Sequence, residues 1–387
     1  MKLEWYADAQ GFDALRPHWN AVLQSSATNT LFLTWEWQQA WWDNFGTGRD
    51  LWLAAARDEG GQVLAILPMF SQETCLDPDL PLPGINIENP LAVSNGSCPA
   101  AAPSERGGRR VRQPTGRSTW QRTVHLGGGS EVSDYLDVIA PAALHHQAWA
   151  MLFDSIAERE GWRFLDLRNL PSSSPSLGAV TELAQARGWT VQQGEEDVCP
   201  VLELPGTWDE YLGTRLDKKQ RHELRRKMRR AEQETRVDWY WAGNENLEEA
   251  LDVFMQLHKA SASAKEAFMD QRMERFFRTA ARAAAEQGWL RLSVLRFDGR
   301  PVASYLCFDY GRDRLVYNSG FEISAYRELS PGIVLVAYMI EDAIKQGCGR
   351  FDFLQGNERY KYEFGAVDTQ VMRLFISRPS GIEYVRR

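Results

Sequence analysis

The order of elements expected between residues 289 and 378 constrains the fold of this chain more than any other feature. Three mostly apolar segments separated by turn residues are predicted to be strands: Trp289–Phe297, Pro301–Tyr310 and Arg314–Phe321. An amphipathic helix is expected from Ser330 to Gly347, and a further strand at Arg350–Leu354. Three strands, a helix and a strand predict a mixed α/β unit.

The start of that helix is suited to anions. Ser330 fits the N-cap, Pro331 fits the first helical position, and Gly347 fits the far end. The first N–H groups of a helix lack intrahelical acceptors and carry a partial positive charge. We therefore expect this helix start to favour a phosphate group.

The length of 387 residues predicts two domains, since it exceeds what one ordinary core accommodates. The first half repeats the order of the second: strand, two helices, three antiparallel strands, helix, strand. We expect two units of one α/β architecture, each a mixed, mostly antiparallel sheet flanked by helices. The predicted boundaries are residues 1–206, a linking helix at 207–235, and 236–387. Residues 94–118, rich in Pro, Gly, Ser and Arg, are predicted to be a mobile insertion.

Finer predictions complete this outline. We expect strands at Tyr135–Ile139, Trp189–Gln192 and Val201–Leu204, and one unbroken helix at Trp208–Glu234. A loop is predicted at Ala260–Ala267.

Several classes of protein are disfavoured by composition. The five cysteines are widely spaced without a C-x-x-C pair, which indicates neither a disulfide framework nor a zinc site, and no metal is expected. The N-terminus does not resemble a secretory signal, and the longest apolar run, Ile333–Ile340, is too short to span a membrane. A net charge of −8 argues against a protein that coats nucleic acid. We expect a soluble cytoplasmic protein.

Short motifs along most of the chain resemble the GCN5-related N-acetyltransferase (GNAT) superfamily. Their details are similar to its CelD-like branch, which is associated with cellulose and exopolysaccharide biosynthesis and related to FemAB-type peptidyltransferases. The motifs are Phe32–Trp37 with Trp41-Trp42, Ser133–Asp137, Leu257-His258 with Lys265, Phe268 and Met269, Tyr317–Phe321, Leu329–Gly332, Phe351–Leu354 and Gly356–Lys361.

This resemblance implies an acyl-CoA donor, such as acetyl-CoA, bound at the start of the helix. The residues expected to contact it are Arg327, Leu329, Ser330, Pro331, Gly332 and Ile333. The family loop usually reads Arg/Gln-x-x-Gly-x-Gly/Ala, whereas this chain has Ser330 in place of the first Gly. Pro331 also lacks an N–H group. FemAB-type relatives use aminoacyl-tRNA instead and do not need this loop.

Four residues are candidates for catalysis of acyl transfer. Glu358 could accept the proton of an attacking amine, Tyr360 could protonate the leaving group, and Lys361 could hold a phosphate or carboxylate. Spacing alone is equally consistent with a solvated turn in which Glu358 and Lys361 form a surface pair. His258 could act as a base, although a histidine on an apolar helix face is more often a core residue.

Further residues could bind substrate. Lys265 in its predicted loop could contact phosphate or carboxylate, and otherwise is a surface lysine. Asp352 could face the cleft or cap a neighbouring loop. The remaining candidates for an acyl pocket, which could equally belong to the core, are Phe268, Tyr317 and Ser319. The tryptophans at 35–42 are best explained as core and domain-contact residues, with sugar stacking as the alternative.

The helix predicted at Trp208–Glu234 carries nine basic and two acidic residues between Arg215 and Arg230. Arg221, Arg225 and Arg229 align on one face, since they lie four residues apart. This face could bind tRNA phosphates, a nucleotide-linked substrate or an anionic membrane, with Arg221 and Arg225 as candidate substrate contacts. Alternatively, the helix is a solvated arm with ion pairs to the acidic body.

The sequence thus favours an N-acyltransferase. We expect direct transfer from acyl-CoA to an amine of a sugar, peptide or cell-envelope precursor, because no G-x-S-x-G nucleophile motif occurs. The alternatives are FemAB-like transfer from aminoacyl-tRNA and a non-catalytic scaffold with the same fold.

Overall fold

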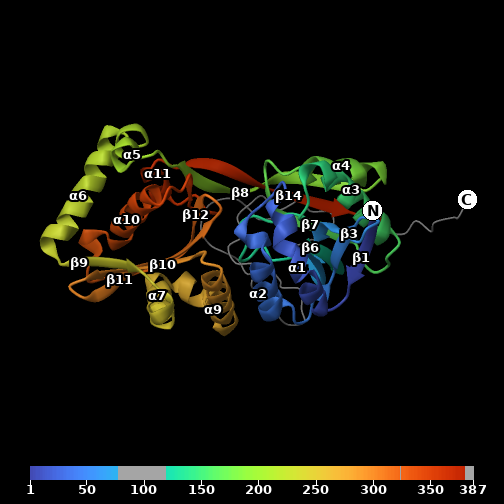
Figure 1. Cartoon of the computed structure of the whole chain (residues 1–387), viewed down its shortest axis with the longest axis horizontal. Coiled ribbons are helices and arrows are strands. Elements are labelled where there is room, and N and C mark those ends of the chain that lie inside the picture. Colours follow the sequence, from blue (N-terminus) through green and yellow to red (C-terminus); the bar gives the residue numbers. More distant parts are fainter. Residues whose placement is uncertain (77–118, 323, 380–387) are drawn as a thin grey trace, which may run out of the picture. The chain divides into compact units, whose positions relative to one another are not determined.

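The computed structural model describes residues 1–76, 119–322 and 324–379 (Figure 1). The chain divides into two compact units. The first comprises Met1–Trp42, Gly46–Asp197 and Gln370–Arg387, and the second comprises Asp43–Phe45 and Val198–Thr369. The predicted insertion at 94–118 lies outside the described residues.

The first unit contains two sheets. Strands β1, β3 and β4 form an antiparallel sheet in the order β1-β3-β4, and the second sheet has the order β2-β5-β6-β7-β14. Its strands are β1 (Lys2–Tyr6), β2 (Asp50–Leu51), β3 (Leu53–Arg57), β4 (Val63–Leu67), β5 (Met69–Leu76), β6 (Thr119–Leu126) and β7 (Phe164–Pro171). Its helices are α1 (Gln10–Gln24), η1 (Leu31–Leu33), α2 (Trp35–Phe45), η2 (Ala142–Leu144), α3 (His145–Ala157) and α4 (Ser176–Ala186).

The second unit is built on one sheet with the strand order β8-β13-β12-β11-β10-β9. Its strands are β9 (Val237–Trp241), β10 (Leu290–Phe297), β11 (Arg300–Tyr310), β12 (Asp313–Phe321) and β13 (Arg350–Asp352), joined by the C-terminal part of β8 (Thr190–Glu203). Its helices are α5 (Trp208–Thr214), α6 (Lys218–Glu234), η3 (Asn244–Asn246), α7 (Leu247–Ser261), α8 (Ser263–Phe268), α9 (Gln271–Glu286), η4 (Arg327–Leu329), α10 (Pro331–Lys345) and α11 (Arg359–Glu363).

Helices cover both faces of this sheet (Figure 1). The core on one face is formed by α10, with α6 packed against α10, and α7 and α9 pack on the other face. The buried residues of α9 recur at helical spacing: Met273, Phe276, Phe277, Ala280, Ala281 and Ala284. This apolar stripe explains why the segment forms a helix and which of its faces is buried.

The predicted α/β fold and its repeated order are confirmed. Each half of the chain begins with a strand and helices, continues with antiparallel strands, and ends with a helix, a strand, a helix and a final strand. The repeat extends to pairing, because β6 pairs with β7 in parallel, as β12 pairs with β13. The units differ in that the antiparallel strands of the first are divided between two sheets, whereas those of the second share one.

Three predicted strands are different in the structure. Tyr135–Ile139 is not a strand, and only Ile139 makes an isolated bridge, to Ile66. Trp189–Gln192 and Val201–Leu204 belong to one strand, β8, because the polar residues between them remain extended. A polar stretch interrupts the apolar pattern without ending a strand whose backbone is paired.

The predicted helix Trp208–Glu234 is two helices, α5 and α6. Asp217 accepts a hydrogen bond from the N–H of Gln220 at 2.8 Å, and the Gln220 side chain accepts one from the N–H of Asp217 at 2.8 Å. This reciprocal capping box begins a new helix, and its Asp-x-x-Gln pattern was legible in the sequence. Both helices lie in the compact second unit, which the sequence analysis began only at residue 236.

The final strand also departs from the predicted boundaries. The strand β14 (Val367–Ser377) pairs antiparallel with β7, and from Gln370 onwards it belongs to the first unit. A strand can pair with any sheet that has a free edge, whatever its place in the sequence. The order of elements along the chain therefore could not show that the second unit ends before residue 387.

One close approach fixes α7 against β12. A Cβ atom on Gly320 would lie 2.2 Å from the backbone nitrogen of His258 and 2.4 Å from the carbonyl carbon of Leu257. Real Cβ atoms do not approach backbone so closely, so the helix backbone packs directly on this glycine. Gly320 thereby sets the distance between His258 on α7 and the end of β12.

We predict that Gly320→Ala lowers the free energy of unfolding by about 2 kcal/mol or more, because the added methyl group displaces α7. Gly213→Ala in α5 is the matched control, since a Cβ there meets no atom within 4 Å. Urea denaturation of both variants tests this. Equal stabilities for the two variants would contradict the packing argument.

Candidate active site

A cavity opens where β12 and β13 separate. Their parallel pairing covers only three residues, from Asp313 opposite Arg350 to Leu315 opposite Asp352. Beyond it β12 bulges at Tyr317, where its register with β11 shifts, and β13 ends. Bulges are common beside active sites because they redirect side chains.

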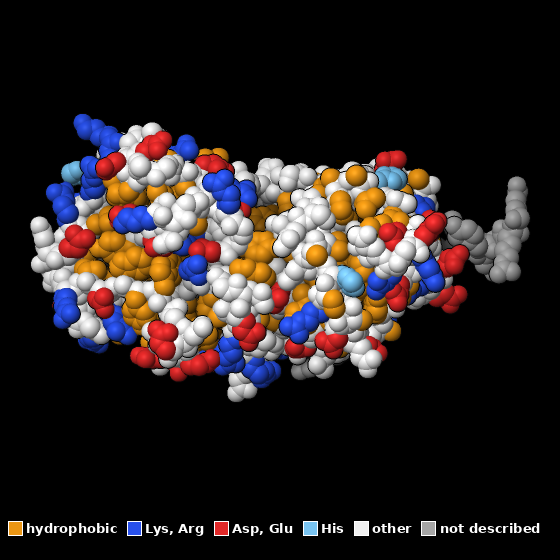
Figure 2. Space-filling model, viewed as in Figure 1, with side chains coloured by type: hydrophobic (Ala, Val, Ile, Leu, Met, Phe, Trp, Pro, Cys, Tyr) orange, Lys and Arg blue, Asp and Glu red, His pale blue; other side chains and the backbone are white. Residues whose placement is uncertain are grey.

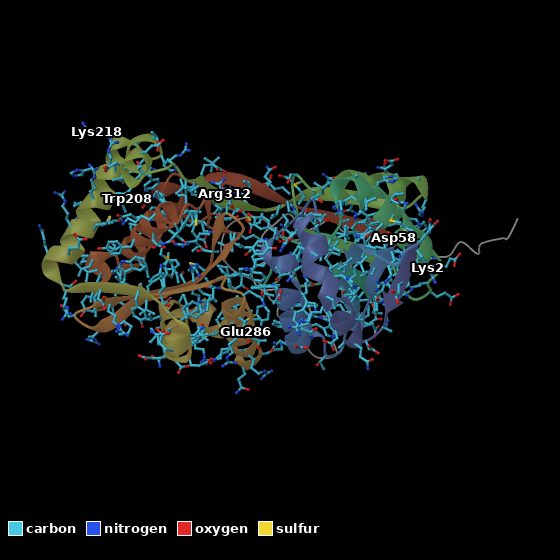
Figure 3. All side chains as sticks on the ribbon, viewed as in Figure 1. Lys2, Asp58, Trp208, Lys218, Glu286 and Arg312 are labelled. Atoms are coloured by element: carbon cyan, nitrogen blue, oxygen red, sulfur yellow. The ribbon has the colours of Figure 1, made fainter. Side chains whose placement is uncertain are left out.

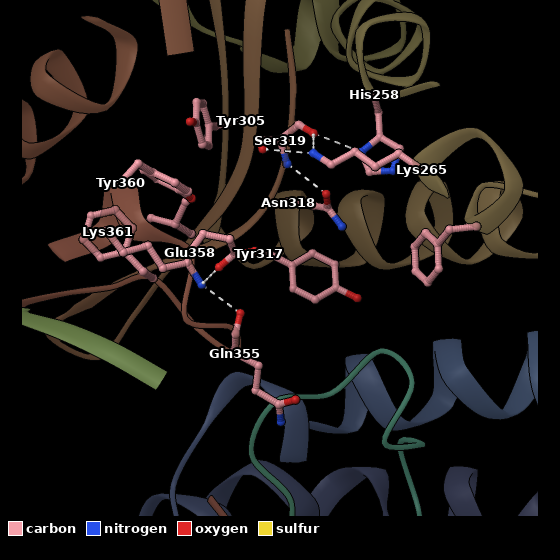
Figure 4. A pocket seen from close by; sticks show the side chains of 13 residues that line it. His258, Lys265, Tyr305, Tyr317, Asn318, Ser319, Gln355, Glu358, Tyr360 and Lys361 are labelled. Carbon is pink, nitrogen blue, oxygen red and sulfur yellow. Dashed lines mark hydrogen bonds and ion pairs between the residues drawn. The ribbon is translucent and has the colours of Figure 1, made fainter. Parts of the chain in front are cut away.

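The cavity has a volume of about 360 Å³ (Figure 4). Its lining residues all come from the second unit: His258, Lys265, Phe268, Tyr305, Val316, Tyr317, Asn318, Ser319, Phe353, Gln355, Glu358, Tyr360 and Lys361. Eight of the candidate residues predicted from the sequence are therefore brought together here. These are His258, Lys265, Phe268, Tyr317, Ser319, Glu358, Tyr360 and Lys361.

The chain turns sharply after β13, and Asp352 stabilises the turn. The carboxylate of Asp352 is buried and accepts a hydrogen bond from the N–H of Leu354 at 2.8 Å. Leu354 has a φ of 56°, a left-handed conformation that is costly for a residue with a Cβ. Of the two roles considered for Asp352, the structure supports capping of a loop, because its side chain does not line the cavity.

Lys361 holds the backbone of this turn. Its side chain is only 3% exposed, and its ammonium group donates to the carbonyl oxygens of Leu354 at 3.1 Å, Gln355 at 2.8 Å and Gly356 at 2.9 Å. It also lies 2.9 Å from a carboxylate oxygen of Glu358. An ammonium group has three N–H donors, and all are used. The expected phosphate or carboxylate contact of Lys361 is thus replaced by a positioning role.

We predict that Lys361→Met lowers the free energy of unfolding by about 2–4 kcal/mol, because one buried and two half-buried carbonyl groups lose their donor. Lys345→Met is the matched control, since Lys345 is exposed and its pair with Glu341 is a surface pair. Thermal or urea denaturation measures both. Equal effects of the two substitutions would show that the carbonyl contacts of Lys361 contribute little.

Ser319 at the end of β12 joins two basic side chains on the opposite wall (Figure 4). Its carbonyl oxygen lies 3.0 Å from Nδ1 of His258 and 2.6 Å from Nζ of Lys265. The Lys265 ammonium also donates to the Ser319 hydroxyl at 3.3 Å. Lys265 does not lie in a loop as predicted, because residues Ser263–Phe268 form the short helix α8.

His258 is buried, and its tautomer follows from its partner. A carbonyl oxygen can only accept, so Nδ1 carries the hydrogen and Nε2 holds a lone pair. Nε2 is buried with no hydrogen-bond partner among the described residues. Burial, with a smaller contribution from the positive charge of Lys265, lowers the pKa of His258 to about 4. The ring is therefore neutral at pH 7 and offers an acceptor at the cavity.

Lys265 is unusual among the lysines of this unit. Burial lowers its pKa from 10.5 to about 8, and the opposing carboxylate of Glu358 raises it in part. A lysine with such a pKa exchanges its proton near physiological pH, which is typical of functional sites.

We predict that Lys265 makes stability depend on pH above neutrality. Between pH 8 and 10.5 the folded state releases this proton while the unfolded state retains it, so the free energy of unfolding rises with pH. Relative to Lys265→Met, the wild type should gain about 2–3 kcal/mol between pH 7 and pH 10.

Urea denaturation at a series of pH values tests this prediction. Lys345→Met serves as the control, because Lys345 is 66% exposed and should show the same pH dependence as the wild type. A constant difference between wild type and Lys265→Met across the range would contradict the lowered pKa.

Two tyrosines complete the cavity. Burial raises the pKa of Tyr360, whose ring packs edge-on against Phe353. Burial also raises the pKa of Tyr305, which the sequence analysis placed in the predicted strand Pro301–Tyr310. Both hydroxyls therefore remain protonated and can donate. The other lining residues missed from the sequence are Val316, Asn318, Phe353 and Gln355, and only the tertiary fold identifies their orientation.

The predicted anion site adjoins this cavity without lining it. The hydroxyl of Tyr305 lies 3.5 Å from the carbonyl oxygen of Gly332 in the first turn of α10. Ser330 occupies the N-cap position, but its φ is 51° and its side chain makes no capping hydrogen bond. The residues expected to bind the donor are all absent from the cavity lining: Arg327, Leu329, Ser330, Pro331, Gly332 and Ile333.

Arg221 and Arg225 lie elsewhere. They line a second cavity of about 630 Å³ on α6, so the expected substrate contacts divide between two sites. Among the described residues, no group of three or more His, Cys, Asp or Glu side chains could hold a metal ion. No helix in the described ranges is long and apolar enough to cross a membrane.

Comparison with known proteins agrees with this architecture. Residues 218–362 match the family described as acetyltransferase (GNAT) domain. The matched residues include every residue that lines the cavity between β12 and β13. Together with the fold, this match supports acyltransferase activity. No curated protein matches the sequence.

Solved structures show the same fold across both units. FemX has a TM-score of 0.60 at 11% identity, with 97% of each chain covered. The C-terminal domain (DUF2156) of a putative lysylphosphatidylglycerol synthetase from Agrobacterium fabrum has a TM-score of 0.52 at 9% identity, covering 95% of this chain and 93% of that one. L-PGS from Bacillus licheniformis has a TM-score of 0.51 at 10% identity, covering 97% and 94%.

The GNAT expectation is confirmed for residues 218–362, and FemX confirms the expected likeness in fold to FemAB-type proteins. The finer assignment to the CelD-like branch stays a prediction.

Proposed function

We propose that the second unit transfers an acyl group from acyl-CoA to an amine, by direct attack and without an acyl-enzyme. The observation that supports this most is the polar cavity between the separating strands β12 and β13, which adjoins the start of α10. The acceptor we propose is an amine of a sugar, a peptide or a cell-envelope precursor, in line with the CelD-like resemblance.

The donor would lie with its phosphates at the start of α10. Gly332 and Ile333 belong to the first turn, where N–H groups have no intrahelical acceptor. A Cβ added at Gly332 would make ordinary van der Waals contacts, at 3.5 Å with the Tyr305 hydroxyl and 3.6 Å with the Phe321 ring, so a substitution at this position need not disturb the packing. The thioester would then extend past Tyr305 into the cavity.

The cavity residues suit the chemistry of the transfer. As the C–N bond forms and the C–S bond breaks, the amine loses a proton, which Glu358 accepts directly or through water. The protonated hydroxyl of Tyr360 donates to the leaving sulfur. Proton exchange with solvent through Glu358 then restores both groups.

The opposite wall would polarise and orient the reactants. The Lys265 ammonium, held by the Ser319 carbonyl, provides positive charge beside the cavity for the developing oxyanion. The neutral His258 ring borders the cavity and holds the end of β12 through its bond to the Ser319 carbonyl oxygen. Ser319 is not an activated nucleophile, because His258 bonds its carbonyl oxygen and Lys265 donates to its hydroxyl.

Titration calorimetry with acetyl-CoA and CoA tests the donor. We expect micromolar binding that Gly332→Asp weakens at least tenfold, because a carboxylate at the helix start stabilises the helix and repels phosphate. Gly332→Asn has the same shape without the charge and should bind within about threefold of the wild type, since neutral groups alter phosphate binding less.

The chemistry is tested with the same protein. Glu358→Gln and Tyr360→Phe should retain CoA binding and lose turnover of an amine acceptor. Unchanged turnover in both variants would exclude the roles proposed for Glu358 and Tyr360 and would favour the non-catalytic scaffold.

The second candidate is transfer from aminoacyl-tRNA, as the FemAB resemblance implies. Two observations favour it: Pro331 offers no N–H group at the helix start, and the side chain of Ser330 makes no capping hydrogen bond. Absence of binding to acetyl-CoA and to CoA in the wild type would place this candidate first.

A further inference from the structure

A second cavity of the same unit is lined by cations and one tryptophan. It measures about 630 Å³ and is bordered by residues of α6 and by Trp208 at the start of α5 (Figure 3). Its lining residues are Trp208, Lys218, Arg221, His222, Arg225, Met228, Arg229 and Glu232. We call this the α6 groove. It shares no lining residue with the cavity between β12 and β13.

Two groups of basic residues on α6 differ in their partners. Arg226 pairs with Glu223 at 2.7 Å, and Arg230 pairs with Glu234 at 2.8 Å, both within the helix. Among the described residues, no carboxylate lies within ion-pair distance of the four groove cations: Lys218, Arg221, Arg225 and Arg229. The sequence analysis expected ion pairs from this helix to the acidic body. Arg226 and Arg230 pair instead with glutamates of the helix itself, and Arg230 also lies 3.9 Å from Glu328 outside it.

The unpaired cations form a stripe. Arg221, Arg225 and Arg229 are four residues apart and therefore repeat about every 6 Å on one face. Like charges at this spacing repel and destabilise an isolated helix. One face of α6 is fixed by packing, because Leu224 and Ala231 are buried in the core with α10. The fold thus holds four cations together, and none of them has a carboxylate within ion-pair distance among the described residues.

The groove has one carboxylate, and it is engaged. Glu232 accepts a hydrogen bond from the hydroxyl of Tyr338 at 2.8 Å. Arg221 donates to the carbonyl oxygen of Leu212 at 3.0 Å, and Arg229 to that of Arg225 at 3.3 Å. A guanidinium has five N–H donors, so both arginines retain donors for a ligand. Figure 2 shows Lys and Arg side chains gathered over this edge of the unit.

Trp208 indicates the kind of anion. Its indole is half-buried, packs at a tilt of 31° against Tyr211 with ring centroids 5.0 Å apart, and borders the stripe of cations. A base can stack on such a ring while its phosphates meet the arginines. The stripe from Lys218 to Arg229 extends about 16 Å, longer than a mononucleotide requires and suited to several linked phosphates.

We propose that the α6 groove binds single-stranded nucleic acid, with phosphates on the four cations and one base on Trp208. The shape favours a strand over a lipid surface, because the cations line a hollow and do not project from an apolar convex face. With a net charge of −8, the rest of the chain repels such a ligand and restricts it to this groove. The inference does not depend on the acyl donor.

Fluorescence anisotropy of a labelled twelve-residue oligouridylate with the full chain tests the proposal. Four phosphate contacts predict that log K falls with log salt with a slope of about −2.8. Arg225→Gln/Arg229→Gln should weaken binding and reduce the slope by about 1.4, since two contacts are lost.

The paired arginines provide the matched control. Arg226→Gln/Arg230→Gln removes the same charge from the same helix, and it should leave affinity within threefold of the wild type. Trp208→Leu should weaken binding roughly tenfold without changing the salt slope, because stacking is not electrostatic. Trp208→Phe should recover most of that loss. Circular dichroism establishes that each variant remains folded.

Three results would overturn the inference. One is an absence of oligouridylate binding at 50 mM salt. Another is an equal loss of affinity in the groove variant and in the control variant, which would indicate general attraction to a basic helix. The third is stronger binding to vesicles rich in phosphatidylglycerol than to oligouridylate, which would identify the groove as a membrane-contact surface.

Discussion

The short parallel pairing of β12 and β13 is the constraint on which the candidate site depends. Pairing ends at Leu315 and Asp352, because β12 bulges at Tyr317 while the backbone after β13 turns through a left-handed residue at Leu354. Two strands that part within a covered sheet leave space that neither fills. Helices α10 and α7 lie on opposite faces of that sheet, and the space becomes a cavity that side chains of α7, α8 and α11 line together with those of the strands.

Two lysines at this cavity illustrate how environment decides the role of a residue type. Lys361 donates to three carbonyl groups and contacts Glu358, so its charge is used to hold the turn. Lys265 bonds Ser319 alone and is half-buried, so burial lowers its pKa to about 8. The first lysine is structural because its partners are fixed backbone. The second can exchange its proton because burial is not compensated by a strong ion pair.

The apolar and the charged side chains of helix α6 lie on different faces of the helix. Leu224 and Ala231 pack towards α10, the arginines paired with glutamates lie on a solvated face, and the groove cations have no carboxylate partner in the described ranges. Burial of the apolar face orients the helix, and this orientation holds the cations around Trp208. The basic residues that distinguish this helix in the sequence thus line a groove only because the helix packs on α10.

The sequence by itself determined the repeated α/β order, the start of α10 and most of the residues around the cavity, because apolar periodicity and helix-start residues act locally. It could not determine that Asp352 and Lys361 hold a turn, that Tyr305 borders the cavity while it remains in the core, or that β14 ends in the first unit. Those outcomes depend on which backbone groups lie nearby after folding, and on which sheet offers a free edge. The tertiary structure also decided the division of the candidate residues between two cavities, since charge and spacing do not reveal which side of a packed helix remains open.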